Sequence, residues 1–390
     1  MVETEGDGKV VVKSNGSRRW LPNAISWVEV KLTNLDGSDA AVGTYRVQFG
    51  KKWFPREALV ENGTSEIPLR RVGDSSCLVK PNDILGYGGE PLEVAFRRLW
   101  QRVPPHIRDV HFDFSAKLWE PEDIDNLGDI VCKFEHRFSK GGSDLGRVTV
   151  DPFRIILKTG AHPVRQKPYR YSPVMNEKVQ IEVDKLLLAG VLRRSYSNWA
   201  SPLVVVAKAN GGVRLTVNYN RINKISVIPT LPIPIVEDIL AELDESKIFS
   251  TLDLVSGFFQ CSIEKDSIPI TAVITPTGLY EFLSVLQGLS SSPGWFHSVM
   301  ARVCDGLERV RVFIDDVIVF SRDEAEHVRD LERFFERMVK FNLKLAPKKT
   351  NLGVKVVTFL GHQVTAEGIG PGPEKVRPLR EVPMPTNVGQ

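Results

Sequence analysis

Short stretches in which apolar and polar residues alternate fill the first 90 residues of the chain. They include KVVVK, ISWVEVKL, GTYRVQF and SSCLV, and segments rich in Gly, Asn and Asp separate them. A period of two is typical of half-buried strands, and the separating residues are typical of turns. We therefore expect residues 1–90 to form a small β-rich module. The module has no D-T-G or D-S-G triplet of an aspartic protease, no phosphate-binding loop and no histidine, so its role stays open.

The period becomes helical between residues 91 and 150. The first helical stretch is EPLEVAFRRLWQRV, and the second opens after Pro121. In the second stretch, apolar residues fall on one face at spacings of three and four, namely Leu127, Ile130, Val131 and Phe134. The Gly-rich SKGGSDLGR that starts at Ser139 is typical of a linker. We expect residues 91–150 to be a helical linker region.

From Asp151 onward the pattern is mixed. Three prolines mark an extended basic segment, and a helix follows that ends at Gly190. The strands SPLVVVAKA and VRLTVNY then form a hairpin joined at Asn-Gly-Gly. Further helices are expected over 236–243, 293–308 and 323–341, with the apolar strands KIFSTLDL and VRVFIDDVIVF between them. Because strands and helices do not alternate as βαβ units, the pattern indicates an α+β fold.

The composition is that of an ordinary soluble globular protein. The chain has 390 residues, of which 42% are hydrophobic and 25% charged, which excludes disorder of the whole and favours two to three domains. The four cysteines show no metal-ligand spacing, so we expect reduced thiols. No apolar run approaches the roughly 18 residues of a membrane span, and no apolar signal region opens the chain. We expect an intracellular protein, cytoplasmic or nuclear, neither secreted nor membrane-bound.

Positive charge is concentrated in one segment. Between Lys158 and Lys224 there are twelve Lys or Arg and three acidic residues, a local net charge of +9 in a chain whose total is +3. Aromatic residues are interleaved with these cations: Tyr169, Tyr171, Tyr196, Trp199 and Tyr219. Cations contact phosphates and rings stack on bases, so the segment is typical of a nucleic-acid surface. A solvated basic face is the alternative.

Three carboxylates lie at the ends of apolar strands. Asp315 and Asp316 are adjacent in VRVFIDDVIVF, which predicts a hairpin with two acids at its tip, and Asp253 ends KIFSTLDL. A tight two-residue turn favours Asn-Gly or Asp-Gly, and two adjacent acids repel unless a cation lies between them. Mg²⁺ prefers such oxygen ligands, and two Mg²⁺ ions can drive phosphoryl transfer. A polar turn is the alternative, since this spacing alone is a weak signal.

Segments around these aspartates resemble gypsy-type LTR retrotransposon and retroviral reverse transcriptases, and they occur in the same order. They are HPVRQKPYRYSP, AGVLRRSYSNWASPLVVVAKANGGVRLTVNYNRIN, FSTLDLVSGFFQ, TGLYEFLSVLQGL, VFIDDVIVFS, HVRDLERFFERM, LKLAPKKTNLG and TFLGHQVTAEGI. The resemblance covers roughly residues 151–388. It implies a fragment of a Pol polyprotein with a right-hand polymerase fold. Fingers and the start of the palm would occupy residues 151–250, palm and primer grip 251–370, and a truncated start of the thumb or connection 371–390.

The resemblance also implies roles for single residues. Asp253 and Asp315 would be the principal metal ligands and Asp316 the supporting one, with Phe313 to Asp316 matching the [YF]xDD box of the family. The other positions implied are Arg214 and Lys208 at the incoming triphosphate, Phe258 as a steric gate against a 2′-hydroxyl, Gln287 near the 3′ end of the nucleotide, and Phe359, Leu360, Gly361 and His362 in a primer-gripping hairpin. Without the resemblance, Phe258 reads as a core residue, Arg214 as half of an ion pair and Gln287 as a polar residue at a strand end.

Some positions depart from the family. Asn218-Tyr219-Asn220 stands where the family has Asp-Tyr-Arg, so we expect a fingers salt bridge to be missing or shifted to Arg221. Residues 290–297, SSSPGWFH, replace a TNAPATFQ-like run and change the packing beside a palm helix, although Pro293 and Phe296 still fit. The chain stops at Gln390, where the thumb, RNase H and integrase of the family continue. We therefore expect low processivity and a second polymerase chain as a partner.

Taken together, the resemblance implies an RNA-directed DNA polymerase that joins dNTPs to a primer 3′-OH on an RNA or DNA template. Two Mg²⁺ ions would serve it, with Mn²⁺ as the alternative. A second hypothesis is an inactive remnant of the element that binds nucleic acid without polymerising. A third, another palm-type enzyme such as a nucleotide cyclase, lacks the glycine-rich turn expected before the acids.

Overall fold

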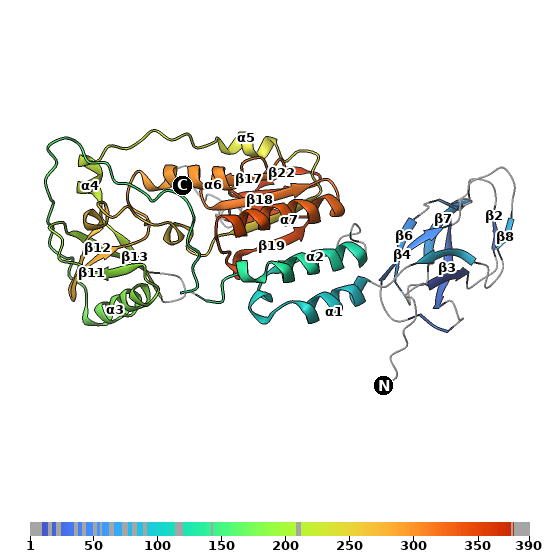
Figure 1. The fold of residues 1–390 in the computed structure, drawn as a ribbon. Helices are drawn as coiled ribbons and strands as arrows, with labels where there is room; N and C mark the ends of the chain where they lie inside the picture. Colours follow the sequence, from blue (N-terminus) through green and yellow to red (C-terminus); the bar gives the residue numbers. More distant parts are fainter. Residues whose placement is uncertain are drawn as a thin grey trace, which may run out of the picture. The chain divides into compact units, whose positions relative to one another are not determined.

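The computed structural model describes residues 10–14, 18–20, 25–34, 38–40, 44–49, 53–54, 57–61, 66–71, 77–79, 84–88, 92–113, 119, 121–141, 143–207, 212–375 and 377. The chain divides into two compact units (Figure 1). Residues 1–103 and 114–133 form the first, and residues 104–113 and 134–390 form the second.

The first unit is built on a seven-stranded antiparallel sheet of order β5-β7-β3-β1-β9-β4-β6. Its strands are β1 (Val10–Ser14), β3 (Ile25–Asn34), β4 (Thr44–Phe49), β5 (Trp53–Phe54), β6 (Glu57–Glu61), β7 (Glu66–Arg71) and β9 (Ile84–Gly88), and β2 (Arg18–Trp20) pairs with β8 (Cys77–Val79) in a separate ribbon. The alternation in GTYRVQF has the expected effect, since Tyr45 and Val47 are both buried.

Two helices, α1 (Leu92–Arg102) and α2 (Pro121–Lys133), belong to the same unit as these strands. They pack on each other, with buried Leu99 of α1 lying against Gly128 of α2, and Arg98 of α1 forms an ion pair with Asp125 of α2. The Gly-rich stretch from Ser139 belongs instead to the second unit, where the Ser139 N–H donates to the Leu345 carbonyl at 2.9 Å and, just after the stretch, the Val148 N–H donates to the Gln260 carbonyl at 2.8 Å. The structure thus divides residues 91–150 between two units, because the stretch that reads as a linker is held by backbone hydrogen bonds.

The second unit contains a five-stranded central sheet of order β10-β19-β14-β18-β17. Its strands are β10 (His111–Phe112), β14 (Ile248–Asp253), β17 (Val310–Phe313), β18 (Asp316–Ser321) and β19 (Asn351–Val354). Only β10 and β19 pair in parallel, and the other neighbours are antiparallel. The two strands predicted around the acids, β14 and β18, are therefore direct neighbours at the centre of the sheet.

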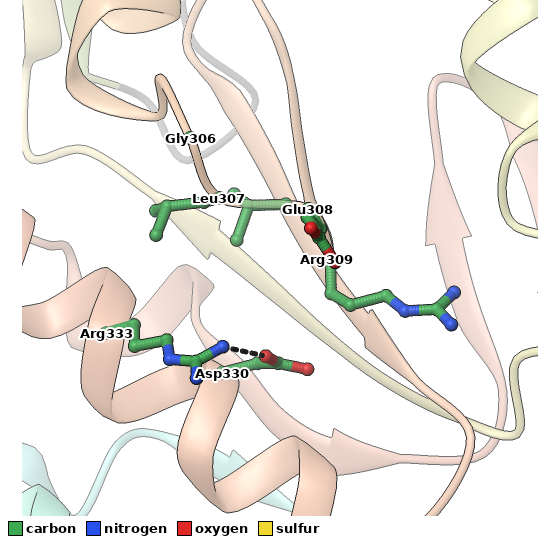
Figure 2. Close-up of a pocket in the computed structure, with 7 residues that line it drawn as sticks. Gly306, Leu307, Glu308, Arg309, Asp330 and Arg333 are labelled. Atoms are coloured by element: carbon green, nitrogen blue, oxygen red, sulfur yellow. Dashed lines mark ion pairs between the residues drawn. The ribbon is translucent and has the colours of Figure 1, made fainter.

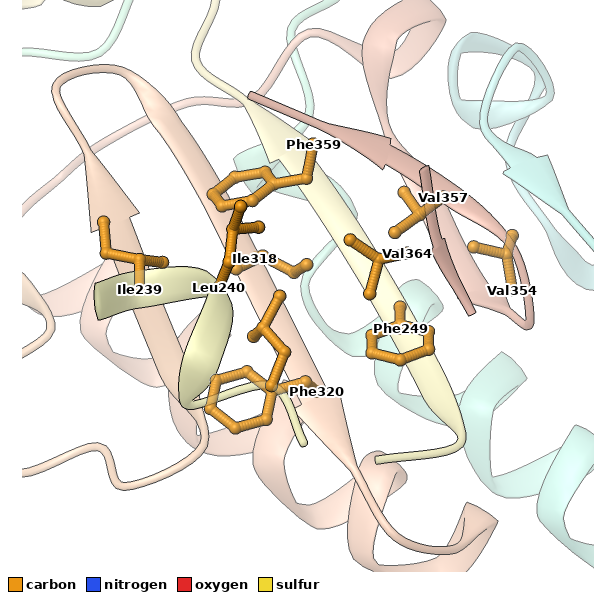
Figure 3. Packing of buried hydrophobic residues seen from close by; sticks show 10 residues of the cluster. Ile239, Leu240, Phe249, Ile318, Phe320, Val354, Val357, Phe359 and Val364 are labelled. Atoms are coloured by element: carbon orange, nitrogen blue, oxygen red, sulfur yellow. The ribbon is translucent and has the colours of Figure 1, made fainter. Parts of the chain in front are cut away.

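Successive side chains of β14 and β18 point to opposite faces of this sheet. On one face, Phe249, Ile318 and Phe320 form a buried cluster with Phe359 and Val364 (Figure 3). These last two belong to a three-stranded sheet of β20 (Val357–Phe359), β21 (His362–Thr365) and β22 (Gly368–Pro371). The apolar cluster thereby packs the hairpin between β20 and β21 against the sheet.

On the other face, α7 (Glu324–Lys340) packs on β18 and β14 through a buried polar network. His327 of α7 is fully buried, with its ring 2.7 Å from Ser250 Oγ and 3.0 Å from Ser321 Oγ. Ser321 donates to Asp330 at 2.8 Å, and the Gly353 N–H donates to Ser250 at 2.9 Å. One helix is thus tied to three adjacent strands.

A second five-stranded sheet has the order β11-β16-β15-β12-β13. Its strands are β11 (Leu192–Arg194), β12 (Ser201–Ala207), β13 (Val213–Val217), β15 (Val273–Thr275) and β16 (Gly278–Phe282). Helix α3 (Pro173–Leu188) contacts β13 and β11, and the hydroxyl of Ser172 caps its first turn by accepting from the Met175 N–H at 3.3 Å. The α+β class is that predicted from the sequence.

The remaining helices are short. They are α4 (Asn220–Ile225), α5 (Val236–Ala241), α6 (Ser292–Val303) and the 3₁₀ helices at Pro105–Ile107, Glu135–Arg137, Gly257–Gln260, Ile268–Thr271 and Pro347–Lys349. Helix α6 ends five residues earlier than predicted, and Gly306 follows with a φ of +76° that no helix continues through. Among the described helices, none has the length and apolar character to cross a membrane.

Candidate active site

The central sheet brings three predicted aspartates to one end. Asp253 is the last residue of β14 and pairs directly with Asp316, the first residue of β18. Asp315 precedes Asp316 in the two-residue loop that joins β17 to β18. Because directly paired residues of antiparallel strands share a face, the carboxylates of Asp253 and Asp316 lie on the same side of the sheet.

These carboxylates repel one another. Asp316 keeps much of its surface exposed, but crowding by protein atoms, followed by repulsion from Asp315 and Asp253, raises its pKa to about 6. Burial also raises the pKa of Asp253, although hydrogen bonding from Lys349 opposes this shift. The site therefore favours a positive charge near the three acids.

Lys349 supplies such a charge. Its Nζ lies 3.0 Å from Oδ2 of Asp253, at the end of the 3₁₀ helix that precedes β19. The lysine side chain is 67% exposed and the aspartate 22%, so the ammonium approaches the acid from solvent. In the described part of the chain, no group of three or more His, Cys, Asp or Glu side chains is arranged to hold a metal ion. The cation that pairs with this cluster of acids is Lys349, through Asp253.

A cavity of about 170 Å³ opens beside this pair. It is lined by Asp253, Asp316 and Lys349 and by polar residues of the neighbouring strands, and Phe359 and Leu360 form part of its wall. Two of the four predicted primer-gripping residues, Phe359 and Leu360, thus lie at the same cavity as two of the predicted metal ligands. Thr251 and Asn351 also line it, joined by a hydrogen bond of 2.8 Å.

The predicted primer-gripping residues form the turn of the β20–β21 hairpin. Phe359 pairs with His362, and both loop residues have positive φ, +49° for Leu360 and +75° for Gly361. This is the backbone of a type I′ turn, which makes Gly361 well suited to its position. Nδ1 of His362 lies 3.1 Å from the Leu360 carbonyl.

Among the residues predicted to contact the nucleotide, Arg214 and Gln287 contact each other, whereas Phe258 packs against α6. The Arg214 guanidinium of β13 donates to Oε1 of Gln287, so these two meet. Phe258 is 8% exposed and stacks on Phe296 of α6 with ring centroids 4.6 Å apart, which is a packing contact. Lys208 lies outside the described residues.

The departures from the family pattern have local explanations. Nδ2 of Asn218 donates to the Tyr169 hydroxyl at 2.9 Å, so a neutral hydrogen bond stands where a fingers salt bridge was considered. Trp295 packs edge-on against Phe153 with ring centroids 5.2 Å apart. His297 is buried, and its Nδ1 accepts a hydrogen bond from the Ile314 N–H next to Asp315.

A second cavity, of about 270 Å³, contains none of the predicted residues. It is lined by Gly306 to Val310 with Asp330 and Arg333, and the last two form an ion pair at 3.7 Å (Figure 2). It is larger than the cavity at Asp253, but the clustered acids and the predicted hairpin residues line the smaller one. We therefore place the candidate site at the aspartates.

Reasoning from the sequence missed Lys349 and His297. Lys349 is 96 residues from Asp253 along the chain, and nothing in the Lys-Lys pair of LAPKKTNLG indicates which acid it meets. His297 had a signal, since it lies in the departing run SSSPGWFH, but that run was read only as a change in packing.

Comparison with known proteins adds an independent result. Residues 206–364 match the family described as "Reverse transcriptase (RNA-dependent DNA polymerase)". Among curated relatives, the Retrovirus-related Pol polyprotein from transposon opus of Drosophila melanogaster is 38% identical over 237 residues, which are 58% of this chain and 23% of that protein. The corresponding polyprotein from transposon 297 of the same species is 32% identical over 272 residues, 68% of this chain and 26% of that protein. The chain spans about a quarter of the length of these relatives.

Solved structures show the same fold. The foamy viral protease-reverse transcriptase in complex with dsDNA superposes with a TM-score of 0.64 at 24% identity, over 77% of this chain and 60% of that chain. The same protein in complex with an RNA/DNA hybrid gives a TM-score of 0.65 at 20% identity, over 95% of this chain and 46% of that chain. The right-hand polymerase fold expected from the sequence is thereby confirmed.

Proposed function

We propose that the reverse transcriptase domain of this chain, residues 206–364, is an RNA-directed DNA polymerase that adds dNTPs to a primer 3′-OH on an RNA or DNA template. One observation carries the proposal. Asp253 and Asp316 are paired across β14 and β18, with Asp315 in the adjoining loop, at a cavity that the β20–β21 hairpin also lines. The site thus combines clustered acids with a hairpin suited to hold a primer end beside them.

The acids fit a divalent metal by their chemistry. Carboxylate oxygens are the ligands that Mg²⁺ prefers, and the raised pKa of Asp316 reflects repulsion that a cation would relieve. In this arrangement the ammonium of Lys349 is paired with Asp253. Asp253 and Asp315 would be the principal ligands and Asp316 the supporting one. When bound, two Mg²⁺ or Mn²⁺ ions would activate the primer hydroxyl and neutralise the leaving pyrophosphate.

The other residues would bind and orient the substrates. We propose that Arg214, with Lys208, contacts the triphosphate of the dNTP and that Gln287 lies near the 3′ end of the nucleotide. The contact between Arg214 and Gln287 supports this, because it places both at one locus. Phe258 would limit the space for a 2′-hydroxyl. The ring is already packed on Phe296, so its position would be rigid.

The nucleic acid would be held mainly by charge. The related foamy viral enzyme has been solved with dsDNA and with an RNA/DNA hybrid, and the segment 158–224 of this chain carries a net charge of +9. Phosphate contacts by Lys and Arg make binding steeply dependent on salt. We therefore propose a primed RNA or DNA template as the partner.

The test is extension of a labelled primer on matched RNA and DNA templates, with Mg²⁺, with Mn²⁺ and with a chelator. We expect metal-dependent extension on both templates. The ion pair between Asp253 and Lys349 favours a second candidate, a domain that binds nucleic acid without polymerising. Binding that weakens steeply with salt, combined with no extension at any metal concentration, would decide for this second candidate.

A further inference from the structure

The loop that carries Asp315 contains a strained residue. Ile314 has a φ of +58°, a left-handed conformation that β-branched residues avoid. It is the first of the two loop residues between the paired Phe313 and Asp316, and the second, Asp315, does not share the positive φ. Positive φ at the first loop position alone matches a type II′ turn, where Gly is the usual residue. Such a backbone persists only where its surroundings hold it.

His297 provides that support. Nδ1 of its ring lies 3.2 Å from the backbone nitrogen of Ile314 and accepts the hydrogen bond of that N–H. The residue is 6% exposed, and burial lowers its pKa. Because Nδ1 accepts, the ring is neutral and its proton lies on Nε2.

The helix that carries His297 is fixed by the three residues just before it. Phe296 is fully buried and stacks on Phe258, and Trp295 packs edge-on against Phe153. Gly294 lies close to the segment that contains Leu231, so that an added Cβ would be 3.2 Å from the Cβ of Leu231. The imidazole therefore projects from a rigid element, which makes it a precise support for the loop.

We propose that His297 is a positioning residue for Asp315: by holding the N–H of Ile314 it fixes the peptide that orients the neighbouring carboxylate. The inference rests on the proposed polymerase function and adds to it a residue specific to this chain, since the TNAPATFQ-like run of the family ends in Gln where this chain has His297. An amide Oε1 can accept the same hydrogen bond. His297 in this chain and Gln in the family are thus alternative acceptors for the same loop N–H.

Two substitutions separate the hydrogen bond from the packing. His297→Leu fills similar space without an acceptor, and His297→Gln restores one. Ser298→Ala is the matched control, because it removes a side-chain hydrogen bond on the same helix, the one from Ser298 Oγ to the Trp295 carbonyl, without touching the loop. Hydrogen exchange of peptides that cover residues 311–317 reports the bond without any need for activity.

In His297→Leu we expect the Ile314 amide to exchange roughly tenfold faster, as for the loss of one hydrogen bond. We expect kcat for primer extension to fall on the order of 10- to 100-fold while KM for dNTP stays within about twofold, as for a misplaced catalytic group. His297→Gln should restore both quantities, and Ser298→Ala should change neither. Unchanged exchange in His297→Leu overturns the inference, and so does faster exchange with an unchanged kcat.

A measurement on the wild type keeps the inference testable if the leucine variant fails to fold. In the ¹⁵N spectrum of histidine-labelled protein at neutral pH, His297 should show Nδ1 unprotonated and Nε2 protonated, in the signal that is lost in His297→Gln. The opposite tautomer would refute the hydrogen bond. If the wild type extends no primer, the proposed function fails, and the exchange and ¹⁵N results alone decide whether His297 holds the loop.

Discussion

The Nζ of Lys349 lies 3.0 Å from Oδ2 of Asp253, on the strand end where Asp253 also faces Asp316. The ammonium of Lys349 stabilises the charged form of Asp253, which repulsion from Asp315 disfavours. A divalent metal that takes this oxygen must displace the lysine, and the displacement is easy because the lysine side chain is 67% exposed. An ion pair of that exposure contributes only about 0–1 kcal/mol.

We therefore predict that Lys349→Met binds Mg²⁺ more tightly than the wild type. The Mg²⁺ concentration at the midpoint of thermal stabilisation should fall about two- to fivefold, which corresponds to roughly 0.5–1 kcal/mol for the lost competitor. Thermal unfolding across a Mg²⁺ titration measures the change. Lys348→Met is the matched control, since that neighbouring lysine lies 3.9 Å from Asp109 instead. Equal midpoints for Lys349→Met and the wild type would show that lysine and metal do not compete.

Asp315→Asn tests the proposed chemistry directly. We expect extension to drop to background, because the amide removes a metal ligand, while affinity for the primed template stays nearly unchanged, since cations hold the backbone. Extension assays and a salt-dependent binding titration measure the two effects. Asp305→Asn, an exposed acid ten residues earlier, should behave like the wild type in both. Normal primer extension by Asp315→Asn would show that Asp315 is not a catalytic residue.

His327 predicts a pH dependence of stability. Burial lowers its pKa to about 3, so the folded protein keeps it neutral while the unfolded chain protonates it below its ordinary pKa of about 6.5. The contribution is fully present above pH 6.5 and is lost as the pH falls from 6.5 toward 3. Between pH 7.5 and pH 5 the loss should be about 2 kcal/mol.

Denaturant unfolding at both pH values, in the wild type and in His327→Asn, measures this contribution. The raised pKa of Asp316 acts in the opposite direction, and it cancels in the comparison of the two proteins. The asparagine variant should be less stable at pH 7.5 but should lose about 2 kcal/mol less on acidification. His162→Asn, at an exposed position, should keep the wild-type pH dependence. The same acid sensitivity in His327→Asn would contradict the prediction.

The parts of the site that lie on regular strands could be predicted from the sequence. Apolar flanks around Asp253 and around the pair at Asp315 indicate adjacent buried strands, and pairing of β14 with β18 brings the acids together. Contacts between distant segments could not be predicted. The lysine at Asp253 comes from a 3₁₀ helix 96 residues away, and the acceptor for Ile314 comes from α6. Both depend on tertiary packing, and local periodicity carries no information about it.

The apolar face of the central sheet predicts a coupling between stability and the hairpin that lines the site. Phe249 is fully buried on β14, four residues before Asp253, and packs in one cluster with Phe359 and Val364 of the β20–β22 sheet (Figure 3). Phe249→Ala should lower the free energy of unfolding by about 3–5 kcal/mol, from lost burial and the cavity left behind. Phe249→Leu, which leaves a smaller cavity, should cost less.

Because the hairpin rests on this cluster, hydrogen exchange in residues 357–365 should increase more in Phe249→Ala than exchange in β12 and β13 of the second sheet. Urea unfolding gives the first quantity, and exchange under native conditions gives the second. An equal increase of hydrogen exchange in residues 357–365 and in β12 and β13 would show that the cluster stabilises the whole unit and does not hold the hairpin in particular. A stability loss confined to about 1 kcal/mol would mean that neighbouring side chains collapse into the space that the ring leaves.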